Sequence, residues 1–356
     1  MNIPTRRDII TKVKSEGGRI AAVMPFHYPR ALLRAFNIHP MEVWGPPHVD
    51  DLSGGQHFPE YTCKIVTRAT RFLQSKSVAD VDYILTPHTC DSLQGMASIL
   101  KDHLDIPQPV VTLYHPRGRR PSDYTFMLAE LRRISEELAE LTGKNPSQNE
   151  FLTAIDSENR ALDLFRRIAE NRHRYVVSDR DFFTVLRARE YLPAEDFISQ
   201  AESLPTGTPN QSGPGLMLSG IVPEPMHLFD HIQSCGAHVL TDDLACCSRR
   251  LYDPVGTGDP LKGLAEHLLS MPPDTTVSTP YAERFDYLLA KMKVAGAKGV
   301  IVYDPKFCEP ELFYIPMFEK AVKAAGFGFL HVEVELGTEI PHTVLNRIDA
   351  FIEVLT

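Results

Sequence analysis

Residues 81–100 read VDYILTPHTCDSLQGMASIL and divide into three parts. The run VDYIL is short and apolar, with the β-branched and aromatic side chains typical of a buried strand. Over residues 91–103 the apolar positions recur at helical spacing, and a turn that contains Pro87 separates the two patterns. A strand that leads into a helix through a short turn is typical of a βαβ unit, so this stretch predicts a parallel sheet.

The same alternation continues toward both ends of the chain. We expect further strands at residues 19–26, 41–44, 110–114, 216–222, 238–240, 299–303 and 329–334, and helices at 29–37, 61–75, 226–235, 261–269, 281–295, 312–325 and 341–354. Between the two groups, residues 122–141, 147–173, 178–191 and 193–204 have helical periodicity. The prediction is an α/β fold with two Rossmann- or flavodoxin-like parallel-sheet domains, residues 1–120 and 206–356, and a helical segment, residues 121–205, between them. Residues 205–214, PTGTPNQSGP, are expected to form an exposed link.

The composition is that of an ordinary globular protein and argues against several classes. Hydrophobic residues make up 43% of the 356-residue chain and charged residues 23%, which excludes a disordered or collagen-like chain. A net charge of −9 argues against a nucleic-acid partner, because such binding depends on neutralising phosphates. Long apolar runs are missing, so we expect no membrane span. The opening residues MNIPTRRD do not resemble a secretory signal, so we expect a cytoplasmic protein.

Three of the six cysteines share a distinctive placement. Cys90 and Cys308 each follow a predicted strand and precede a helix, and Cys63 opens a predicted helix. Functional groups in open α/β sheets gather at the carboxyl ends of strands, and a helix N-terminus favours the thiolate that binds metal. The three thiolates could therefore converge between the domains. Three buried core cysteines are the alternative interpretation, and position alone leaves both open.

Other possible sites carry weaker signals. His227 and His231 are four residues apart on a predicted helix and could bind one metal, although core or surface histidines commonly have this spacing. The adjacent Cys246 and Cys247 are expected to point apart and so to chelate poorly together. The sequence contains no phosphate-binding P-loop motif, and so predicts no nucleoside triphosphate site of its own.

Several motifs along the chain follow one another in a recognisable order. They are YP at residues 28–29, IHPME at 38–42, YTC at 61–63, TCDS at 89–92, TDDL at 241–244 with SR at 248–249, and DPKFCEPELF at 304–313. This ordered set resembles the iron–sulfur subunits of 2-hydroxyacyl-CoA dehydratases and benzoyl-CoA reductases. The run DSLQG after Cys90 differs from that of the double-cubane branch and is similar to the single-cluster branch.

The resemblance implies a cofactor, partners and a reaction. Cys63, Cys90 and Cys308 would hold one [4Fe–4S] cluster, with the fourth iron open. A homologous second subunit and an ATP-hydrolysing iron–sulfur activator protein would be partners, and an acyl-CoA thioester the substrate. The reaction would be reductive radical chemistry, either dehydration of a 2-hydroxyacyl-CoA or reduction of an aromatic acyl-CoA. His27 and His88, both expected at strand ends, are the candidate acid–base groups.

Two other functions stay open at this point. The chain could be an electron-relay subunit whose paralogous partner binds the substrate, or a zinc-dependent hydrolase that uses cysteines or His227 and His231. Arg117, Arg119 and Arg120 could supply the positive charge that CoA phosphates require, or could simply belong to a solvated loop.

Overall fold

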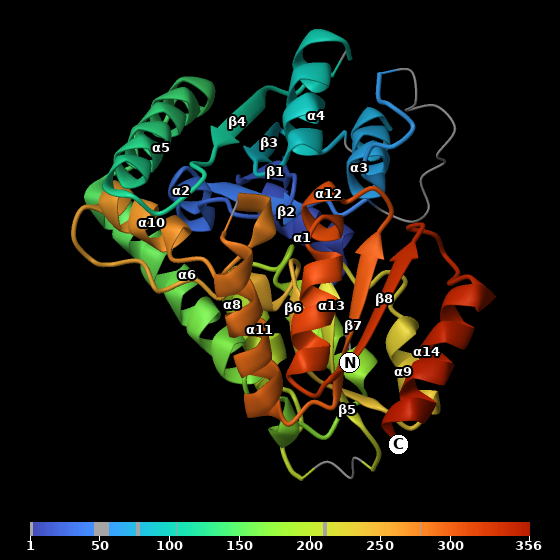
Figure 1. The fold of residues 1–356 in the computed structure, drawn as a ribbon. Helices are drawn as coiled ribbons and strands as arrows, with labels where there is room; N and C mark the ends of the chain where they lie inside the picture. Colours follow the sequence, from blue (N-terminus) through green and yellow to red (C-terminus); the bar gives the residue numbers. More distant parts are fainter. Residues whose placement is uncertain (1–2, 46–56, 76–78, 105, 209–211, 278) are drawn as a thin grey trace.

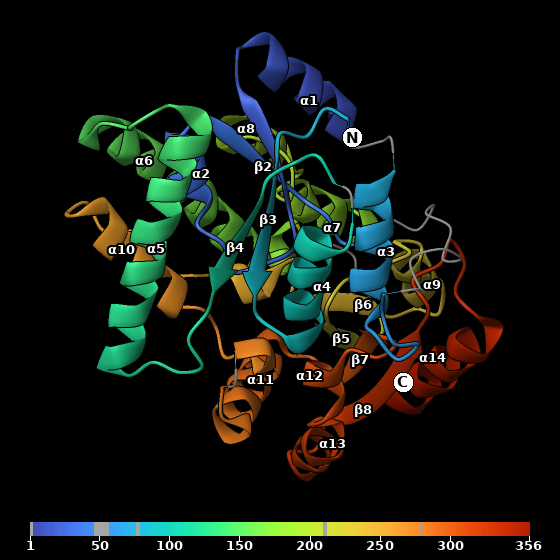
Figure 2. The ribbon, with the colours of Figure 1, turned by 90° about the horizontal axis from the view of Figure 1, so that it is seen from above.

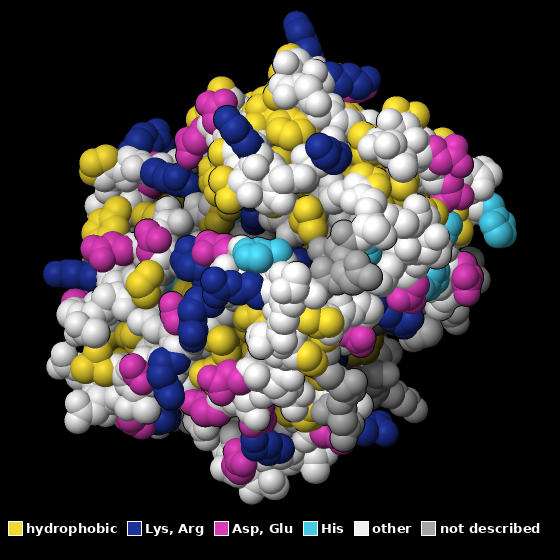
Figure 3. All heavy atoms as spheres, turned by 90° about the horizontal axis from the view of Figure 1, so that it is seen from below, with side chains coloured by type: hydrophobic (Ala, Val, Ile, Leu, Met, Phe, Trp, Pro, Cys, Tyr) yellow, Lys and Arg dark blue, Asp and Glu magenta, His cyan; other side chains and the backbone are white. Residues whose placement is uncertain are grey.

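The computed structural model describes residues 3–45, 57–75, 79–104, 106–208, 212–277 and 279–356. These residues form two sheets of four parallel strands, and helices surround both sheets (Figure 1). The predicted α/β class with two parallel sheets is therefore confirmed. Among the described helices, none is both long and apolar enough to cross a bilayer. Basic and acidic side chains are mixed over the face seen from below (Figure 3).

The first sheet has the strand order β2-β1-β3-β4. Its strands are β1 (Arg19–Val23), β2 (Ile38–Glu42), β3 (Tyr83–His88) and β4 (Val110–Tyr114). Alternate residues of β1 belong to different apolar clusters, so both faces of the sheet are buried. One face is covered by α3 (Lys64–Gln74) and α4 (Asp91–Asp102), and the other by α2 (Arg30–Ala35) and α5 (Pro121–Thr142) (Figure 2).

The second sheet repeats this arrangement with the order β6-β5-β7-β8. Its strands are β5 (Gly215–Gly220), β6 (His238–Leu244), β7 (Gly299–Pro305) and β8 (Gly328–Val334). On one face lie α9 (Leu228–Ser234) and α14 (His342–Leu355), and on the other α11 (Tyr281–Ala295) and α13 (Ile315–Ala324). In both sheets the strand order reverses between the two central strands, so that the chain continues toward opposite edges of the sheet from these two strands. Ligands of open α/β sheets bind at the carboxyl ends of the strands at such a point, so we expect a site there.

The helical segment packs against both sheets. It contains α6 (Gln148–Ala169), α7 (Asp179–Ala188), α8 (Ala194–Glu202) and the 3₁₀ helix η3 (Arg172–Arg174). Phe165, Phe182 and Phe197 lie in the same apolar cluster as Ile84 of β3 and Leu218 of β5. Farther along the chain, α10 (Pro260–Leu269) packs on α5 and α6. One continuous core therefore joins the parts, and the division of the chain at residues 120 and 205 stays a prediction.

The structure contains elements that the pattern analysis missed. The N-terminal helix α1 (Arg6–Ser15) begins with a reciprocal cap in which Thr5 and Asp8 satisfy each other's backbone N–H groups. The expected helix 312–325 is two helices, α12 (Glu309–Leu312) and α13, because Pro316 in the first turn of α13 starts a new helix. The remaining elements are the 3₁₀ helices η4 (Ser248–Arg250) and η5 (Thr275–Val277). Residues 209–211 of the expected link lie outside the described residues.

Candidate functional site

Cys63, Cys90 and Cys308 each occupy the N-cap position of a helix. They precede α3, α4 and α12, respectively. Cys90 follows β3 and Cys308 follows β7, which hold the same place in the strand orders of the two sheets. The chain thus presents one cysteine at the equivalent strand end of each sheet, and Cys63 joins them from the N-terminus of a neighbouring helix.

The two sheets bring these cysteines together. Cys63 and Cys308 lie near enough for each thiol to shift the pKa of the other, and the adjacent backbone N–H of Lys64 donates to the carbonyl of Lys306 at 3.4 Å. Cys90 lies within electrostatic range of the Cys63 thiol. Cys63 and Cys308 are buried, whereas Cys90 is half-buried. The result is a sulfur-rich site at the junction of the sheets.

Backbone N–H groups surround two of these sulfur atoms. Those of Ile65 and Val66 face Cys63, and those of Ser92 and Leu93 face Cys90. The contact with Cys308, assisted by these N–H groups, lowers the pKa of Cys63, while burial raises the pKa of Cys90 to about 12. The contact with Cys63 and burial raise the pKa of Cys308. A metal that binds Cys90 and Cys308 must therefore displace protons that the protein alone retains on these two thiols.

The backbone that leads to Cys308 has an unusual conformation. Phe307 has φ = 65°, in the left-handed region that non-glycine residues rarely adopt. Nearby, Gly220 at the end of β5 has φ = 132°, and a β-carbon there would lie 2.2 Å from the carbonyl oxygen of Tyr303. Glycine adopts this conformation without strain, whereas a position such as Phe307 costs about 1–3 kcal/mol, and positions of this kind concentrate at functional sites.

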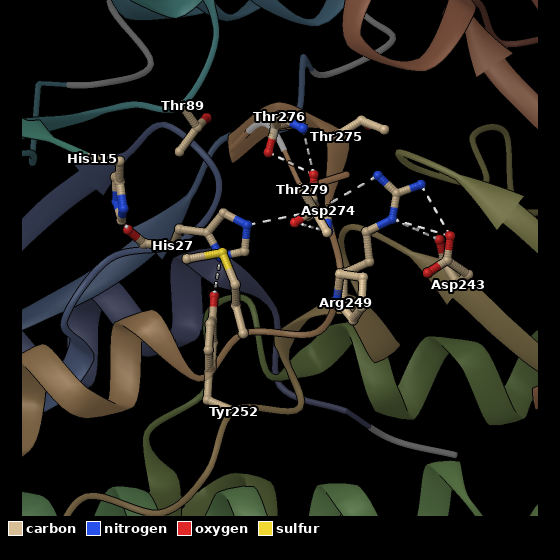
Figure 4. Close-up of polar contacts among 12 residues, drawn as sticks. His27, Thr89, His115, Asp243, Arg249, Tyr252, Asp274, Thr275, Thr276 and Thr279 are labelled. Atoms are coloured by element: carbon tan, nitrogen blue, oxygen red, sulfur yellow. Dashed lines mark hydrogen bonds and ion pairs between the residues drawn. The ribbon is translucent and has the colours of Figure 1, made fainter. Parts of the chain in front are cut away.

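A buried ion-pair network fixes the helix that Cys308 begins. Arg249, which is fully buried, donates to both carboxylate oxygens of Glu311 on α12 at 2.7 Å. Its Nε donates to the carbonyl of Asp243 at 3.0 Å, and its Nη1 lies 3.7 Å from Asp274 Oδ2 (Figure 4). Arg284 adds a 2.7 Å bond to Asp243 Oδ2. Glu311 is one helical turn after Cys308, so this network sets the position of that cysteine.

The next residue, Arg250, pairs with the other sheet. It donates to both oxygens of Glu42 at the end of β2, at 2.8 and 2.6 Å. Tyr28 and Trp44 also donate to this carboxylate, each at 2.9 Å. Arg249 and Arg250 therefore tie one short 3₁₀ helix to the cysteine helix on one side and to the first sheet on the other.

His27 is buried between these two networks. Its Nδ1 is 2.6 Å from the hydroxyl of Tyr252, and its Nε2 is 3.6 Å from Asp274 Oδ2 (Figure 4). Thr276 donates to Asp274 through both its backbone N–H and its hydroxyl, at 2.7 Å. Burial lowers the pKa of His27, so the imidazole is neutral at neutral pH although a carboxylate faces it. His27 also has φ = 60°, a second strained position.

A small cavity adjoins His27. Its volume is about 60 Å³, and its walls include Phe26, Tyr252, Leu162 and the ion-paired Arg250 and Glu42. This space is well below the range of about 300 Å³ and above that is typical of pockets for drug-sized ligands.

His88 and His115 lie at the ends of neighbouring strands in the first sheet. His88 ends β3, is half-buried, and has its ring 5.4 Å from that of Tyr114. His115, directly after β4, shares a hydrogen bond through Nε2 with the carbonyl of His27. Sequence reasoning missed His115 as a site residue, although its place after a predicted strand is the same signal that singled out His27. Burial lowers the pKa of His115 to about 3.

The remaining predicted metal ligands have other partners. The Nε2 of His231 is 2.6 Å from Asp349 Oδ1 on α14 and 3.9 Å from the sulfur of Cys235, one helical turn along. His227 is the N-cap of α9. The expectation that Cys246 and Cys247 point apart is wrong, because their sulfurs are 3.7 Å apart. The backbone at Cys247, with φ = −126° and ψ = −105°, turns both side chains to the same side.

The arginine loop after β4 makes contacts within the chain. Arg117 donates to the carbonyls of Thr89 and Thr276 at 3.1 and 2.6 Å, and Arg119 donates to that of Met271 at 2.6 Å. Arg120 pairs with Asp123 in its own helix cap. Each guanidinium thus already has a structural partner.

Comparison with known proteins identifies the family. The model of the family described as "2-hydroxyglutaryl-CoA dehydratase, D-component" matches residues 25–355. The chain belongs to this family. The family that the motifs resembled is therefore confirmed.

Relatives within the dehydratase and reductase family match along most of their length. The chain is 24% identical to the beta subunit of (R)-2-hydroxyglutaryl-CoA dehydratase of Acidaminococcus fermentans, over 98% of this chain and 96% of that one. It is 25% identical to the beta subunit of lactoyl-CoA dehydratase of Anaerotignum propionicum, over 96% and 93%. It is also 25% identical to one of the subunits of benzoyl-CoA reductase of Thauera aromatica, over 84% and 81%.

The ion pair that positions Cys308 can be tested by Glu311→Gln. Loss of this carboxylate leaves Arg249 buried with fewer counter-charges, and we expect the free energy of unfolding to fall by about 3 kcal/mol. Denaturant unfolding measures the change, and Glu309→Gln, at an exposed position on the same helix, is the matched control. Equal stability of the two variants would contradict the assigned role of Glu311.

The buried histidines predict a pH dependence of stability. The unfolded chain takes up a proton at His115 below pH 6.5, but the folded protein takes it up only near pH 3 because burial lowers the pKa of this group. Stability should therefore fall as the pH is lowered through this window, and His115→Gln should remove about 1.4 kcal/mol per pH unit from the slope between about pH 6 and pH 4.5. Denaturant titrations at several pH values measure the slope. An unchanged slope in the variant would show that His115 titrates normally.

Proposed function

We propose that the chain is the iron–sulfur subunit of a 2-hydroxyacyl-CoA dehydratase or an aryl-CoA reductase, and that Cys63, Cys90 and Cys308 hold a [4Fe–4S] cluster. The observation that carries the proposal is that these three cysteines begin helices, two of them at corresponding strand ends of the two sheets, and lie near enough to shift one another's pKa. Thiolates are the ordinary ligands of such clusters, and three of them leave one iron open. The family to which the chain belongs supports the same assignment.

The surroundings of the thiols fit this cofactor. N–H groups directed at Cys63 and Cys90 stabilise negative charge on sulfur, and hydrogen bonds to cluster sulfurs tune the reduction potential. Burial of Cys63 and Cys308 limits access of water. When bound, the cluster would supply one-electron transfer at low potential. The role of the chain is to hold Cys308 against Cys63 through the Arg249–Glu311 pair.

His27 is the proposed acid–base group nearest to the cavity. Asp274 faces its Nε2 and Tyr252 binds its Nδ1, so the imidazole is held in one orientation. His27 and Tyr252 both line the cavity, and a proton can pass between Nδ1 and the tyrosine hydroxyl across 2.6 Å. His88 is the second candidate, because it is half-buried at the end of β3, two residues before Cys90.

We propose that the enzyme is cytoplasmic and contains more than this chain. The relatives are all named as single subunits of larger enzymes, which supports a homologous second subunit as partner. Tyr61 and Phe313, which are 65% and 67% exposed, lie close in sequence to Cys63 and Cys308 and offer apolar contacts for a partner there. The sequence has no P-loop motif, so ATP hydrolysis is assigned to a separate activator protein.

The size of the cavity favours a second candidate function. The space beside His27, about 60 Å³, is small for an acyl-CoA thioester, and His27 does not line the larger space of about 390 Å³ beside Arg117, Arg119 and Arg120. The chain could therefore relay electrons to a partner that binds the substrate. Binding of acyl-CoA to the isolated chain would distinguish the catalytic role from the relay role.

Of the two reactions, we favour dehydration, and an anaerobic assay of the complex with activator, ATP and reductant on both substrate types decides between them.

The cluster assignment predicts the iron content of cysteine variants. After anaerobic reconstitution, the chain should hold about four iron and about four sulfide ions. Cys63→Ser, Cys90→Ser and Cys308→Ser should each retain less than about one quarter of that iron, because each removes a ligand. Cys235→Ser is the matched control and should retain all of it. Full iron in any of the first three variants would contradict the assignment of that cysteine.

A further inference from the structure

A second group of metal-binding side chains lies between α9 and α14. His231 Nε2 is 2.6 Å from Asp349 Oδ1, Cys235 Sγ is 3.2 Å from the same oxygen, and the sulfur is 3.9 Å from His231 Nε2. Among the described residues, this is the group of His, Cys, Asp and Glu side chains whose ligand atoms all lie within 4.8 Å of one another. The two helices pack against each other on one face of the second sheet (Figure 1).

We propose that His231, Cys235 and Asp349 bind a zinc-class divalent cation that joins α9 to the C-terminal helix α14. One nitrogen, one sulfur and one carboxylate oxygen are all ordinary zinc ligands. This site is separate from the cysteines that cap α3, α4 and α12, because it lies between two helices that cover one face of the second sheet.

The geometry needs only a small adjustment to accept the ion. Ordinary zinc–ligand bond lengths at tetrahedral angles place the three ligand atoms about 3.3–3.6 Å from one another. The observed separations of 2.6, 3.2 and 3.9 Å differ from these values by less than about 1 Å. His231 and Cys235 are fixed one helical turn apart, so rotation of the Asp349 side chain can supply most of the change.

The charges and the exposure also suit a divalent cation. A thiolate at Cys235 and the carboxylate of Asp349 would together neutralise the two positive charges of the ion. On binding, the ion takes the place of the thiol proton, which is released, and the proton on His231 Nε2 moves to Nδ1, so that the neutral ring binds the ion through Nε2. The side chains of His231 and Asp349 are 23% and 40% exposed, so a water molecule can complete the coordination.

A cysteine nucleophile activated by histidine fits the contacts less well. In such a pair the thiol contacts the imidazole, and the carboxylate contacts the other ring nitrogen. Here the sulfur is closer to Asp349 than to His231, and both side chains are directed at the same oxygen atom. Convergence of three ligand atoms on one point is the arrangement that a metal ion requires.

The test is zinc binding by the reconstituted full-length chain. We expect one Zn²⁺ per chain to remain bound after desalting. Cys235→Ser and Asp349→Asn should each weaken zinc affinity by at least about 100-fold, because loss of a metal ligand should cost no less than loss of a residue that supports one. His227→Gln, at the position one turn before His231, is the matched control and should bind zinc normally. Zinc should also raise the melting temperature of the wild-type chain and the control, but not that of the two ligand variants.

X-ray absorption at the zinc edge separates this site from the three cysteines proposed to hold iron. One sulfur and three nitrogen or oxygen neighbours support the proposal, whereas three sulfur neighbours would place the zinc at Cys63, Cys90 and Cys308 and overturn it. Failure to bind zinc at micromolar concentration, or unchanged affinity in Cys235→Ser, would also overturn it. None of these outcomes depends on the iron content of the chain.

Discussion

The ion pair between Arg249 and Glu311 joins the second sheet to the helix that begins with Cys308. Both side chains are fully buried, and the two parallel hydrogen bonds at 2.7 Å fix the guanidinium and the carboxylate in one plane. A buried pair of this kind contributes little net stability over apolar packing, because both charges lose their hydration. Its effect here is geometric, because it holds α12, and with it Cys308, at the end of β7.

The adjacent Arg250 extends the same constraint to the first sheet. Its bidentate contact with Glu42 links β2 to the 3₁₀ helix that carries Arg249. The two consecutive arginines thus link the helix that Cys308 begins to the first sheet. His27 lies where the networks approach each other, with Asp274 on one side and Tyr252 on the other. The groups proposed for electron transfer and for proton transfer are therefore held by one set of charges.

Much of this arrangement could be predicted from local sequence. The strand–turn–helix pattern around Cys90 and Cys308 indicated both positions, because parallel strands place their following helices at one edge of a sheet. The parallel sheets follow from the same pattern. The cap of α1 at Thr5 and the apolar residues Ile9 and Val13, four positions apart, were also visible in the sequence, although this helix was missed. The mutual influence of Cys63 and Cys308 could not be derived in this way, since it depends on how two distant segments pack.

Other features depend on pairings that no local pattern contains. Glu311 and Asp274 are ordinary acidic residues in the sequence, and only the fold shows that both face Arg249. The spacing of His227 and His231 suggested a metal pair, but the helix begins at His227, and the partners of His231 are Cys235 and Asp349. The contacts of Asp274, Glu311 and Asp349 join residues far apart in the chain, so the sequence shows that these residues are acidic but not which residues they contact. Cys235, four residues after His231, is the exception.

The contact between Cys63 and Cys308 can be measured without any metal. Mild oxidation of the metal-free chain with diamide, followed by peptide mass mapping, reports which thiols lie close enough to form a disulfide. We expect a cross-linked peptide that joins Cys63 to Cys308 in the wild-type chain, and much less of it in Glu311→Gln. Separate alkylation of Cys63 and Cys308 under conditions that oxidise other cysteines of the folded chain would contradict it.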